Sequence, residues 1–310
     1  YQILSGLVGS EMCIRDRVLP HLFDKSMAYV KERAKKKKPF FLFVGLTAPH
    51  TPSSPEPGFE GKSPVGVYGD FVMNTDACIG RIRDHLRKAG LDQNTLVMVS
   101  SDHGPGHYSG PERKAIAKQM EKMEKQGHFS RGPWRGYKFS GYEGGLRVPF
   151  AAAWPGVIRP GTENDALVGL VDLMATWAGV AGVKLDPSQA PDSLSFLPYL
   201  ESKEPLARNH LLARGTRADV YYQGNWKLIL GPGSGSSGPF FTEPKSEDAW
   251  KEAIEVFGRN PANHKELEDP IFVQLYNLKN DPAEENHTPS CARGTVADIC
   301  LLYTSDAADE

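Results

Sequence analysis

Side chains that could do chemistry together flank three short apolar runs of the chain. His50 lies in the loop after the run 40–46, and Asp102 and His103 follow a second run. Lys138 stands a few residues before a third apolar segment. A carboxylate and an imidazole can bind a metal ion, while an ammonium and a second imidazole can stabilise negative charge or transfer a proton. The four residues together favour a site that holds a cation and an anion.

Each of these residues taken alone also has a plain structural interpretation. A histidine in a proline-flanked loop more often bonds to the backbone than takes part in catalysis, and an aspartate after a strand most often caps a turn. Position supports the functional interpretation, because ligands of an open α/β sheet collect at the carboxyl ends of its strands. On the residues alone, the two interpretations are equally well supported.

Helices must position this site from the faces of the predicted sheet. Apolar residues recur at helical spacing in 19–34 and in 72–86, and Gly90 is a natural end for the second helix. The same spacing predicts a third helix over 165–178. Cys78 lies within the second pattern, which predicts a small core residue there.

Strands alternate with these helices along the chain. The runs 40–46 and 95–100 are apolar on both faces, as strands buried between helical layers are. A third strand is expected over 146–154. The predicted fold class is therefore α/β, with a mostly parallel sheet flanked by helices.

The pattern changes after about residue 205, where a hairpin is predicted. Residues 220–223 and 226–230 alternate around Gly224-Asn225, which is a typical two-residue hairpin loop. A helix near 249–257 and a last strand over 272–278 complete a small α+β subdomain with an antiparallel sheet.

Composition excludes several classes of protein. The chain has 310 residues, of which 40% are hydrophobic, so it can bury a core. Lys and Arg number 36 against 38 Asp and Glu, so we expect no nucleic-acid partner. No apolar run reaches the roughly 18 residues of a membrane span, and we expect none. Four cysteines are too few to form a disulfide framework for a chain of this size.

The two ends of the chain look foreign to it. Residues 7–17 (LVGSEMCIRDR) and 300–310 (CLLYTSDAADE) resemble translated sequencing adapters. We therefore expect 1–17 to be adapter-derived or unassigned, 18–205 to be the C-terminal part of a catalytic domain, 206–299 to be the small subdomain, and 300–310 to be adapter-derived. The chain is then expected to be a fragment of a longer protein.

Several segments, in this order and spacing, resemble the type I, formylglycine-dependent sulfatases, which include the arylsulfatases. The resemblance covers most of 39–287 and rests on the run 40–46 with Ala48-Pro49-His50, Tyr68-Gly69-Asp70, Gly80-Arg81-Ile82, Asn94-Thr95-Leu96-Val97 through Ser101-Asp102-His103-Gly104, Lys138, and Tyr142-Glu143-Gly144-Gly145-Leu146-Arg147-Val148-Pro149-Phe150. Weaker similarity follows at Trp154-Pro155-Gly156 and at Leu275-Tyr276-Asn277-Leu278 with Asp281-Pro282.

The resemblance implies a fold and a set of roles. The fold would be an incomplete alkaline-phosphatase-like sulfatase core. Asp102 and His103 resemble metal ligands for a divalent cation, usually calcium, although many members have Asn where this chain has His103. His50 and Lys138 resemble catalytic residues that hold the sulfate and assist departure of the alcohol. The segment 142–145 is interpreted as a structural glycine turn, and Arg147 as an anchor for a buried pair or loop rather than a sulfate ligand.

The resemblance also implies what lies outside this chain. The family nucleophile is a formylglycine made from Cys or Ser in a C/S-x-P/A-x-R segment, which lies upstream with two acidic metal ligands. We expect this chain to contain no such segment, so the parent enzyme is expected to hydrolyse sulfate esters while this fragment is inactive alone. A sulfated small molecule or glycan is the expected substrate, and a formylglycine-generating or anaerobic maturation enzyme the expected partner. Export to the periplasm or the exterior is expected from resemblance only.

Alternatives remain open from the sequence. A phosphodiesterase or phosphonate monoester hydrolase of the alkaline-phosphatase-like superfamily would share the sheet and the Asp-His pair, although the segment from Lys138 to Gly145 favours the sulfatase. A pseudoenzyme or carbohydrate-binding remnant is the non-enzymatic alternative. An apparent helix over 111–126 is either a solvated surface helix or the rim of a substrate pocket.

Overall fold

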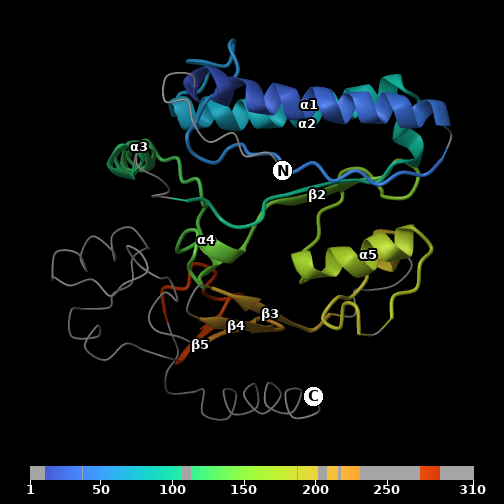
Figure 1. The fold of residues 1–310 in the computed structure, drawn as a ribbon. Coiled ribbons are helices and arrows are strands. Elements are labelled where there is room, and N and C mark those ends of the chain that lie inside the picture. The colour runs from blue at the N-terminus through green and yellow to red at the C-terminus, as the bar shows by residue number, and fades with distance from the viewer. Residues whose placement is uncertain are drawn as a thin grey trace. The chain divides into compact units, whose positions relative to one another are not determined.

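The computed structural model of the chain contains two compact units (Figure 1). The described residues are 11–36, 38–106, 113–186, 188–201, 208–215, 218–230 and 273–286. The first unit consists of 1–97, 108–128 and 153–156, and the second of 98–107, 129–152 and 157–310. The units interleave along the chain, and the domain boundaries expected from the sequence stay predictions.

Two long helices form the core of the first unit. Helix α1 (Glu11–Lys36) packs against α2 (Val67–Lys88), as Figure 1 shows. Both helices agree with the apolar spacing, although each begins earlier than the spacing indicates. Two buried clusters lie between the helices, one of Leu19, Phe71 and Cys78 and one of Met27, Val30 and Leu86. Cys78 is fully buried, which confirms its predicted place in the core, and burial raises the pKa of its thiol.

Helix α2 ends at the predicted glycine. Gly90 has φ of +69°, and its N–H donates to the carbonyl of Arg87 while the N–H of Leu91 donates to that of Leu86. These two bonds form a Schellman motif, which needs a residue in the left-handed region at Gly90. Glycine is therefore required there by backbone conformation.

The predicted strand over 40–46 is not a strand in the described structure. The segment is extended but belongs to no ladder. Alternate side chains, including Phe40 and Leu42, pack against the α1 and α2 core, whereas Phe41 and Phe43 are 59% and 74% exposed. The prediction of burial on both faces is wrong for these residues, because within the described chain only one face of the segment is covered.

The strand predictions around the candidate site are partly confirmed. Strands β1 (Val97–Ser100) and β2 (Phe150–Ala153) form a two-stranded sheet, which is half-buried in β1 rather than fully buried. Leu146, the first residue of the predicted third strand, instead ends the helical turn α4 (Glu143–Leu146), and the strand begins only at Phe150. Of the sheet expected between the helices, the described residues contain these two strands.

The remaining helices lie close to their predicted positions. Helix α3 (Arg113–Lys125) confirms the helix expected over 111–126. The helix expected over 165–178 begins later, as η2 (Leu170–Asp172) followed by α5 (Leu173–Val180). Asp172 explains the later start, because its carboxylate accepts the N–H of Gly169 at 2.9 Å and so caps the helix there. Two short elements, η1 (Asp92–Asn94) and α6 (Leu197–Leu200), complete the helices described.

A four-stranded antiparallel sheet forms the C-terminal part of the second unit. Its order is β3-β4-β5-β6, with β3 (His210–Arg214), β4 (Asp219–Gln223), β5 (Trp226–Leu230) and β6 (Val273–Asn277). Gln223 pairs with Trp226 across the two-residue loop, and Gly224 has φ of +55°, so the predicted hairpin is confirmed. The helix predicted near 249–257 lies outside the described residues.

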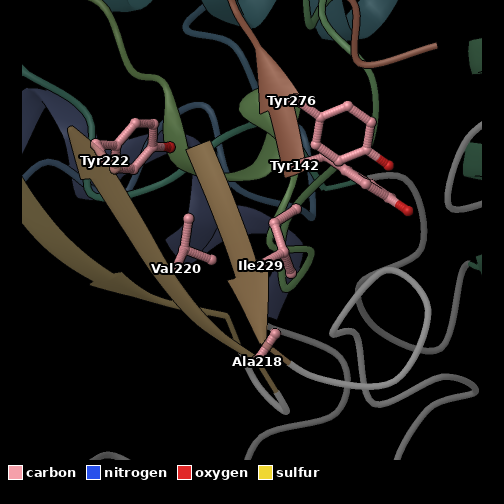
Figure 2. Close-up of a cluster of buried hydrophobic side chains, with 6 residues drawn as sticks. All are labelled: Tyr142, Ala218, Val220, Tyr222, Ile229 and Tyr276. Atoms are coloured by element: carbon pink, nitrogen blue, oxygen red, sulfur yellow. The ribbon is translucent and has the colours of Figure 1, made fainter. Parts of the chain in front are cut away.

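The two faces of this sheet carry different clusters. Figure 2 shows one face, where Tyr142 from the α4 segment packs with the sheet residues Val220, Tyr222, Ile229 and Tyr276. The opposite face carries Tyr221, Leu228 and Leu275. The first face therefore joins the sheet to the turn that contains α4.

Among the described helices, none combines the length and the apolar character required to cross a membrane.

Candidate active site

The loop that contains Asp102 and His103 is fastened to two other site segments in the second unit. The N–H of Gly104 donates to the carbonyl of Gly145 at 2.9 Å, and the N–H of Lys138 donates to the carbonyl of Pro105 at 2.9 Å. Three of the four predicted site residues thus lie on backbone segments that the structure brings together.

Glycine is required where these segments meet. A Cβ atom on Gly104 would lie 1.8 Å from the carbonyl oxygen of Gly144, and one on Gly144 would lie 2.2 Å from the carbonyl oxygen of Gly136. Backbone atoms cannot move aside as a flexible side chain can, so only residues without Cβ permit this approach. The glycine turn predicted at 142–145 is therefore structural, as expected.

Asp102 and His103 form a pair with a defined ring orientation. His103 Nδ1 lies 2.8 Å from the carbonyl oxygen of Gly104, which can only accept, so Nδ1 carries the proton. The other ring nitrogen, Nε2, lies 3.2 Å from Asp102 Oδ2. A metal-ligating histidine commonly donates its second nitrogen to a carbonyl in this way, leaving a lone pair for the ion.

The donor set fits part of a cation site. Asp102 is 81% exposed and offers carboxylate oxygens, and Nε2 of His103 lies beside them. Calcium takes six to eight oxygen ligands, so these two residues need further donors. Among the described residues, no group of three or more His, Cys, Asp or Glu is placed to hold a metal ion.

Lys138 is followed by a strained residue. Phe139 has φ of +77°, in the left-handed region that bulky side chains rarely adopt. The Lys138 ammonium lies 5.2 Å from the centroid of the Phe139 ring. Strain of this kind costs on the order of 1–3 kcal/mol and persists only where the surrounding structure imposes it.

His50 lies in the first unit, apart in the chain from the other three residues. Its side chain is exposed, and Nδ1 lies 2.6 Å from the carbonyl oxygen of Thr51, to which it donates a hydrogen bond. The loop that follows is held to α2, since Asp70 accepts the N–H groups of Gly61 and Ser63 at 2.8 and 2.6 Å.

This loop borders an open pocket of about 430 Å³ within the first unit. Hydroxyl and carboxylate groups stand among its walls, which are formed by Ser53, Ser54, Pro55, Pro57, Glu60, Gly61, Val67 and Asp70. Such walls suit a ligand rich in hydroxyl groups.

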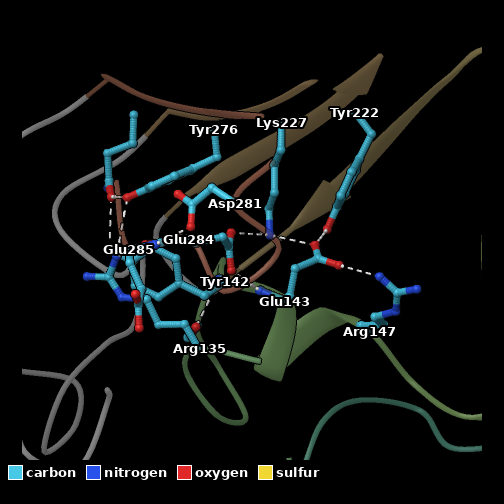
Figure 3. Close-up of polar contacts among 12 residues, drawn as sticks. Arg135, Tyr142, Glu143, Arg147, Tyr222, Lys227, Tyr276, Asp281, Glu284 and Glu285 are labelled. Carbon is cyan, nitrogen blue, oxygen red and sulfur yellow. Dashed lines mark hydrogen bonds and ion pairs between the residues drawn. The ribbon is translucent and has the colours of Figure 1, made fainter. Parts of the chain in front are cut away.

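The structure also contains a buried ionic cluster that the sequence pattern did not predict (Figure 3). Lys227 Nζ lies 2.8 Å from Glu143 Oε1 and 2.8 Å from Glu284 Oε1, and Tyr222 Oη donates to Glu143 Oε1 at 2.8 Å. The contact with Glu143 is a hydrogen bond, whereas that with Glu284 has an ion-pair distance without hydrogen-bond alignment. A lysine inside the apolar strand Trp226–Leu230 was the available signal for this cluster.

Burial and charge act against each other within this cluster. Burial disfavours the carboxylate of Glu143, but the ammonium of Lys227 and the hydroxyl of Tyr222 outweigh burial and lower the pKa of Glu143. Burial raises the pKa of Glu284 in spite of Lys227, and the nearby Glu143 carboxylate adds to the rise. Burial would lower the pKa of Lys227, yet Tyr222 and the two carboxylates raise it.

Two arginines surround the cluster. Arg135 is buried, its Nη1 donates to the backbone carbonyl of Glu284 at 2.5 Å, and its guanidinium lies 4.0 Å from the Tyr142 ring centroid. Arg147 pairs with Glu143 at 3.5 Å and lies 4.2 Å from the Trp134 ring centroid. Arg147 thus makes the anchoring contacts expected of it.

One correction concerns the nucleophile pattern. The string Ser109-Gly110-Pro111-Glu112-Arg113 fits S-x-P-x-R, although it follows the Asp102 loop instead of preceding the first predicted strand. Ser109 lies outside the described residues. The expectation that the chain contains no such pattern is therefore wrong, since the pattern occurs once, at Ser109.

Comparisons with known proteins identify the family of this chain. A family model described as "Sulfatase" matches residues 20–183. An N-acetylgalactosamine-6-O-sulfatase of Bacteroides thetaiotaomicron is 32% identical over 271 residues, which are 87% of this chain and 47% of that protein. An N-acetylgalactosamine-6-sulfatase of Rattus norvegicus is 28% identical over 84% of this chain and 46% of its own length.

Solved structures show the same relationship. A Bacteroides thetaiotaomicron protein from a glycosaminoglycan-metabolism locus superimposes with a TM-score of 0.74 at 27% identity, over 94% of this chain and 54% of that one. A sulfatase from Pseudoalteromonas sp. gives 0.69 at 21% identity, over 94% and 53%, and supports the fold alone. The chain belongs to the sulfatase family and has its α/β, alkaline-phosphatase-like fold. It spans about half the length of the relatives it matches.

Proposed function

We propose that the protein to which this chain belongs hydrolyses sulfate esters. The observation that carries the proposal is the backbone attachment of the Asp102–His103 loop to Lys138 and Gly145, in a chain of the sulfatase family. Family members generally use a formylglycine and a divalent cation. The sulfatase match also disfavours the phosphodiesterase alternative.

Each residue has a proposed role in this reaction. Asp102 and His103 hold a divalent cation, for which we propose calcium, and a bound cation would supply positive charge beside the sulfate oxygens. Lys138 binds the sulfate through its ammonium. His50 donates a proton to the departing alcohol oxygen, which needs one as the S–O bond breaks. Lys138 supplies the positive charge for sulfate binding, and His50 supplies the proton.

The substrate class is proposed to be a sulfated sugar. The relatives named above are described as N-acetylgalactosamine-6-sulfatases, which supports a sulfated amino sugar. The hydroxyl-lined pocket beside the His50 loop is suited to a sugar ring. We further propose that the formylglycine nucleophile arises upstream through a maturation enzyme, and that the complete protein acts in the periplasm or outside the cell.

The test uses the complete protein, produced together with a formylglycine-generating enzyme. Lys138→Ala and His50→Ala should each lower kcat on a sulfated sugar by roughly 10²-fold or more. Asp102→Asn should weaken calcium binding, and added calcium should partly restore the rate. Lys88→Ala, a change at an exposed lysine in the last turn of α2, is the control and should keep the normal rate. Near-normal rates for Lys138→Ala and for Asp102→Asn at limiting calcium would rule the site out.

A further inference from the structure

The ionic cluster on the C-terminal sheet is buried to an unusual degree. The side chains of Lys227, Glu143 and Glu284 are 0%, 5% and 0% exposed. Transfer of a charge out of water costs several kcal/mol, and apolar residues of similar volume would often serve stability as well or better. Apolar side chains such as Val220 and Ile229 are fully buried beside the cluster. A role in specifying one arrangement explains the charges better than a contribution to stability does.

The cluster acts on the backbone of the α4 turn as well as on side chains. Glu284 Oε2 accepts the backbone N–H of Glu143 at 2.6 Å, at the first residue of α4. Lys227 then holds the Glu143 side chain from the sheet. Both ends of the residue are thereby fixed, which determines the orientation of the peptide units that follow.

One of those peptide units contacts the loop that contains Asp102 and His103. The carbonyl of Gly145, two residues after Glu143, accepts the N–H of Gly104. The carbonyl of Gly104 in turn accepts the proton of His103 Nδ1 at 2.8 Å. Three hydrogen bonds, joined by the backbone of 143–145 and of Gly104, therefore lead from the buried cluster to the ring of His103.

We propose that Lys227 and Glu284 are positioning residues, which hold the α4 turn so that the Asp102–His103 loop keeps its orientation. That this loop binds a metal ion rests on the proposed function. The positioning itself is a property of this chain, whether or not the protein hydrolyses sulfate esters.

The experiment measures the loop directly by amide hydrogen exchange in the full chain. The N–H groups of Gly104 and Lys138 report the two bonds that fasten the loop. In Lys227→Met and in the milder Glu284→Gln, both amides should exchange about 10-fold faster or more. The ¹⁵N shifts of the His103 ring should also lose the signature of a fixed Nδ1–H tautomer.

A matched control separates positioning from general stability. Leu228→Ala removes a buried side chain from the same strand but on the opposite face of the sheet, where Tyr221 and Leu275 lie. Exchange is compared at denaturant concentrations that give the variants equal residual stability. Leu228→Ala should leave the two amides and the His103 ring as in the parent chain.

Equal effects of Leu228→Ala and Glu284→Gln on these amides would overturn the proposal, as would unchanged exchange in Glu284→Gln. Glu284→Gln keeps the side-chain volume, so it provides the answer if Lys227→Met does not fold. No sulfate ester or metal enters the measurement, so its failure is distinguishable from failure of the proposed function.

Discussion

The backbone amide of Lys138 donates a 2.9 Å hydrogen bond to the carbonyl of Pro105, which joins two segments more than thirty residues apart in the sequence. Pro105 follows the Asp102–His103 pair by two residues, so the bond fixes the exit of that loop. The Gly104–Gly145 bond fixes the residue before it. The loop is thereby held at two successive residues, which explains how exposed side chains can keep a defined geometry.

Gly104→Ala should detach this loop from the α4 turn. Its methyl group would overlap the Gly144 carbonyl oxygen at 1.8 Å, and we expect a loss of about 1–3 kcal/mol in the free energy of unfolding. Gly80→Ala is the matched control, because nothing lies within 4 Å of its added methyl group in α2. That change should be neutral or stabilise by up to about 1 kcal/mol. Urea unfolding of both variants checks the difference, and equal stabilities would contradict the close packing.

The chain by itself should not hydrolyse an aryl sulfate. Metal and sulfate ligands stabilise charge but provide no nucleophile. Turnover of an aryl sulfate by the purified chain is the measurement. If turnover is found and Ser109→Ala abolishes it, the S-x-P-x-R string at Ser109 is the nucleophile segment and the expectation is wrong.

Glu143→Gln should remove an acid-dependent part of the stability. The folded-state pKa of Glu143 is lowered from 4.5, so its contribution is present above about pH 4.5 and is lost as pH falls through the folded value. At pH 7 the variant should be less stable by about 1.5–3 kcal/mol, because a hydrogen bond between charged groups is lost. The difference between parent and variant should shrink between pH 5 and pH 3, since acid removes the same charge from the parent. A difference that grows as pH falls in this range would contradict the lowered pKa.

The contribution of Glu284 to stability should change with pH in the opposite direction to that of Glu143. Its pKa is raised, so its contribution is present at low pH and is lost as pH rises through the raised value. Urea unfolding of Glu284→Gln and the parent across pH 4–8 therefore serves as an internal check. The variant should become relatively more stable as pH rises, the reverse of the trend for Glu143→Gln.

Asp172→Ala should destabilise the second unit strongly. Arg208 binds the Asp172 carboxylate through two nitrogens, with Nε at 3.0 Å from Oδ2, and the two side chains are 5% and 1% exposed. Removal of the carboxylate leaves a buried guanidinium unpaired and should cost about 3–5 kcal/mol. Asp84→Ala breaks an exposed pair with Arg87 and should change stability by less than about 0.5 kcal/mol. Thermal and urea unfolding of both variants test this contrast.

Local features of the fold could be predicted, and long-range ones could not. The hairpin around Gly224-Asn225 and the end of α2 at Gly90 depend on neighbouring residues, and the structure confirms both. Burial of Phe41 and Phe43 depends on which segments cover them, which periodicity does not reveal. The late start of α5 depends on the capping carboxylate of Asp172, a residue that apolar spacing ignores.

The candidate site divides in the same way. Residue type and a place beside strands select Asp102, His103 and Lys138, and the structure brings their segments together. The relation of His50 to them stays a prediction. Lys227 is a signal as a lysine within an apolar strand, but its partner Glu143 could not be predicted, because only the tertiary fold brings the two charges together.

The buried cluster also sets an order of events during synthesis of the chain. Glu143 meets Lys227 only after 84 further residues, and its backbone N–H meets Glu284 only after 141. Until residue 284 has left the ribosome, the backbone N–H of Glu143 lacks its acceptor, the carboxylate of Glu284. The cluster around the Glu143 carboxylate is then also incomplete. Contacts between residues so distant form slowly, because the intervening chain must first be ordered. The loop that contains Asp102 is thus synthesised early in this chain but is among the last parts to reach its final conformation.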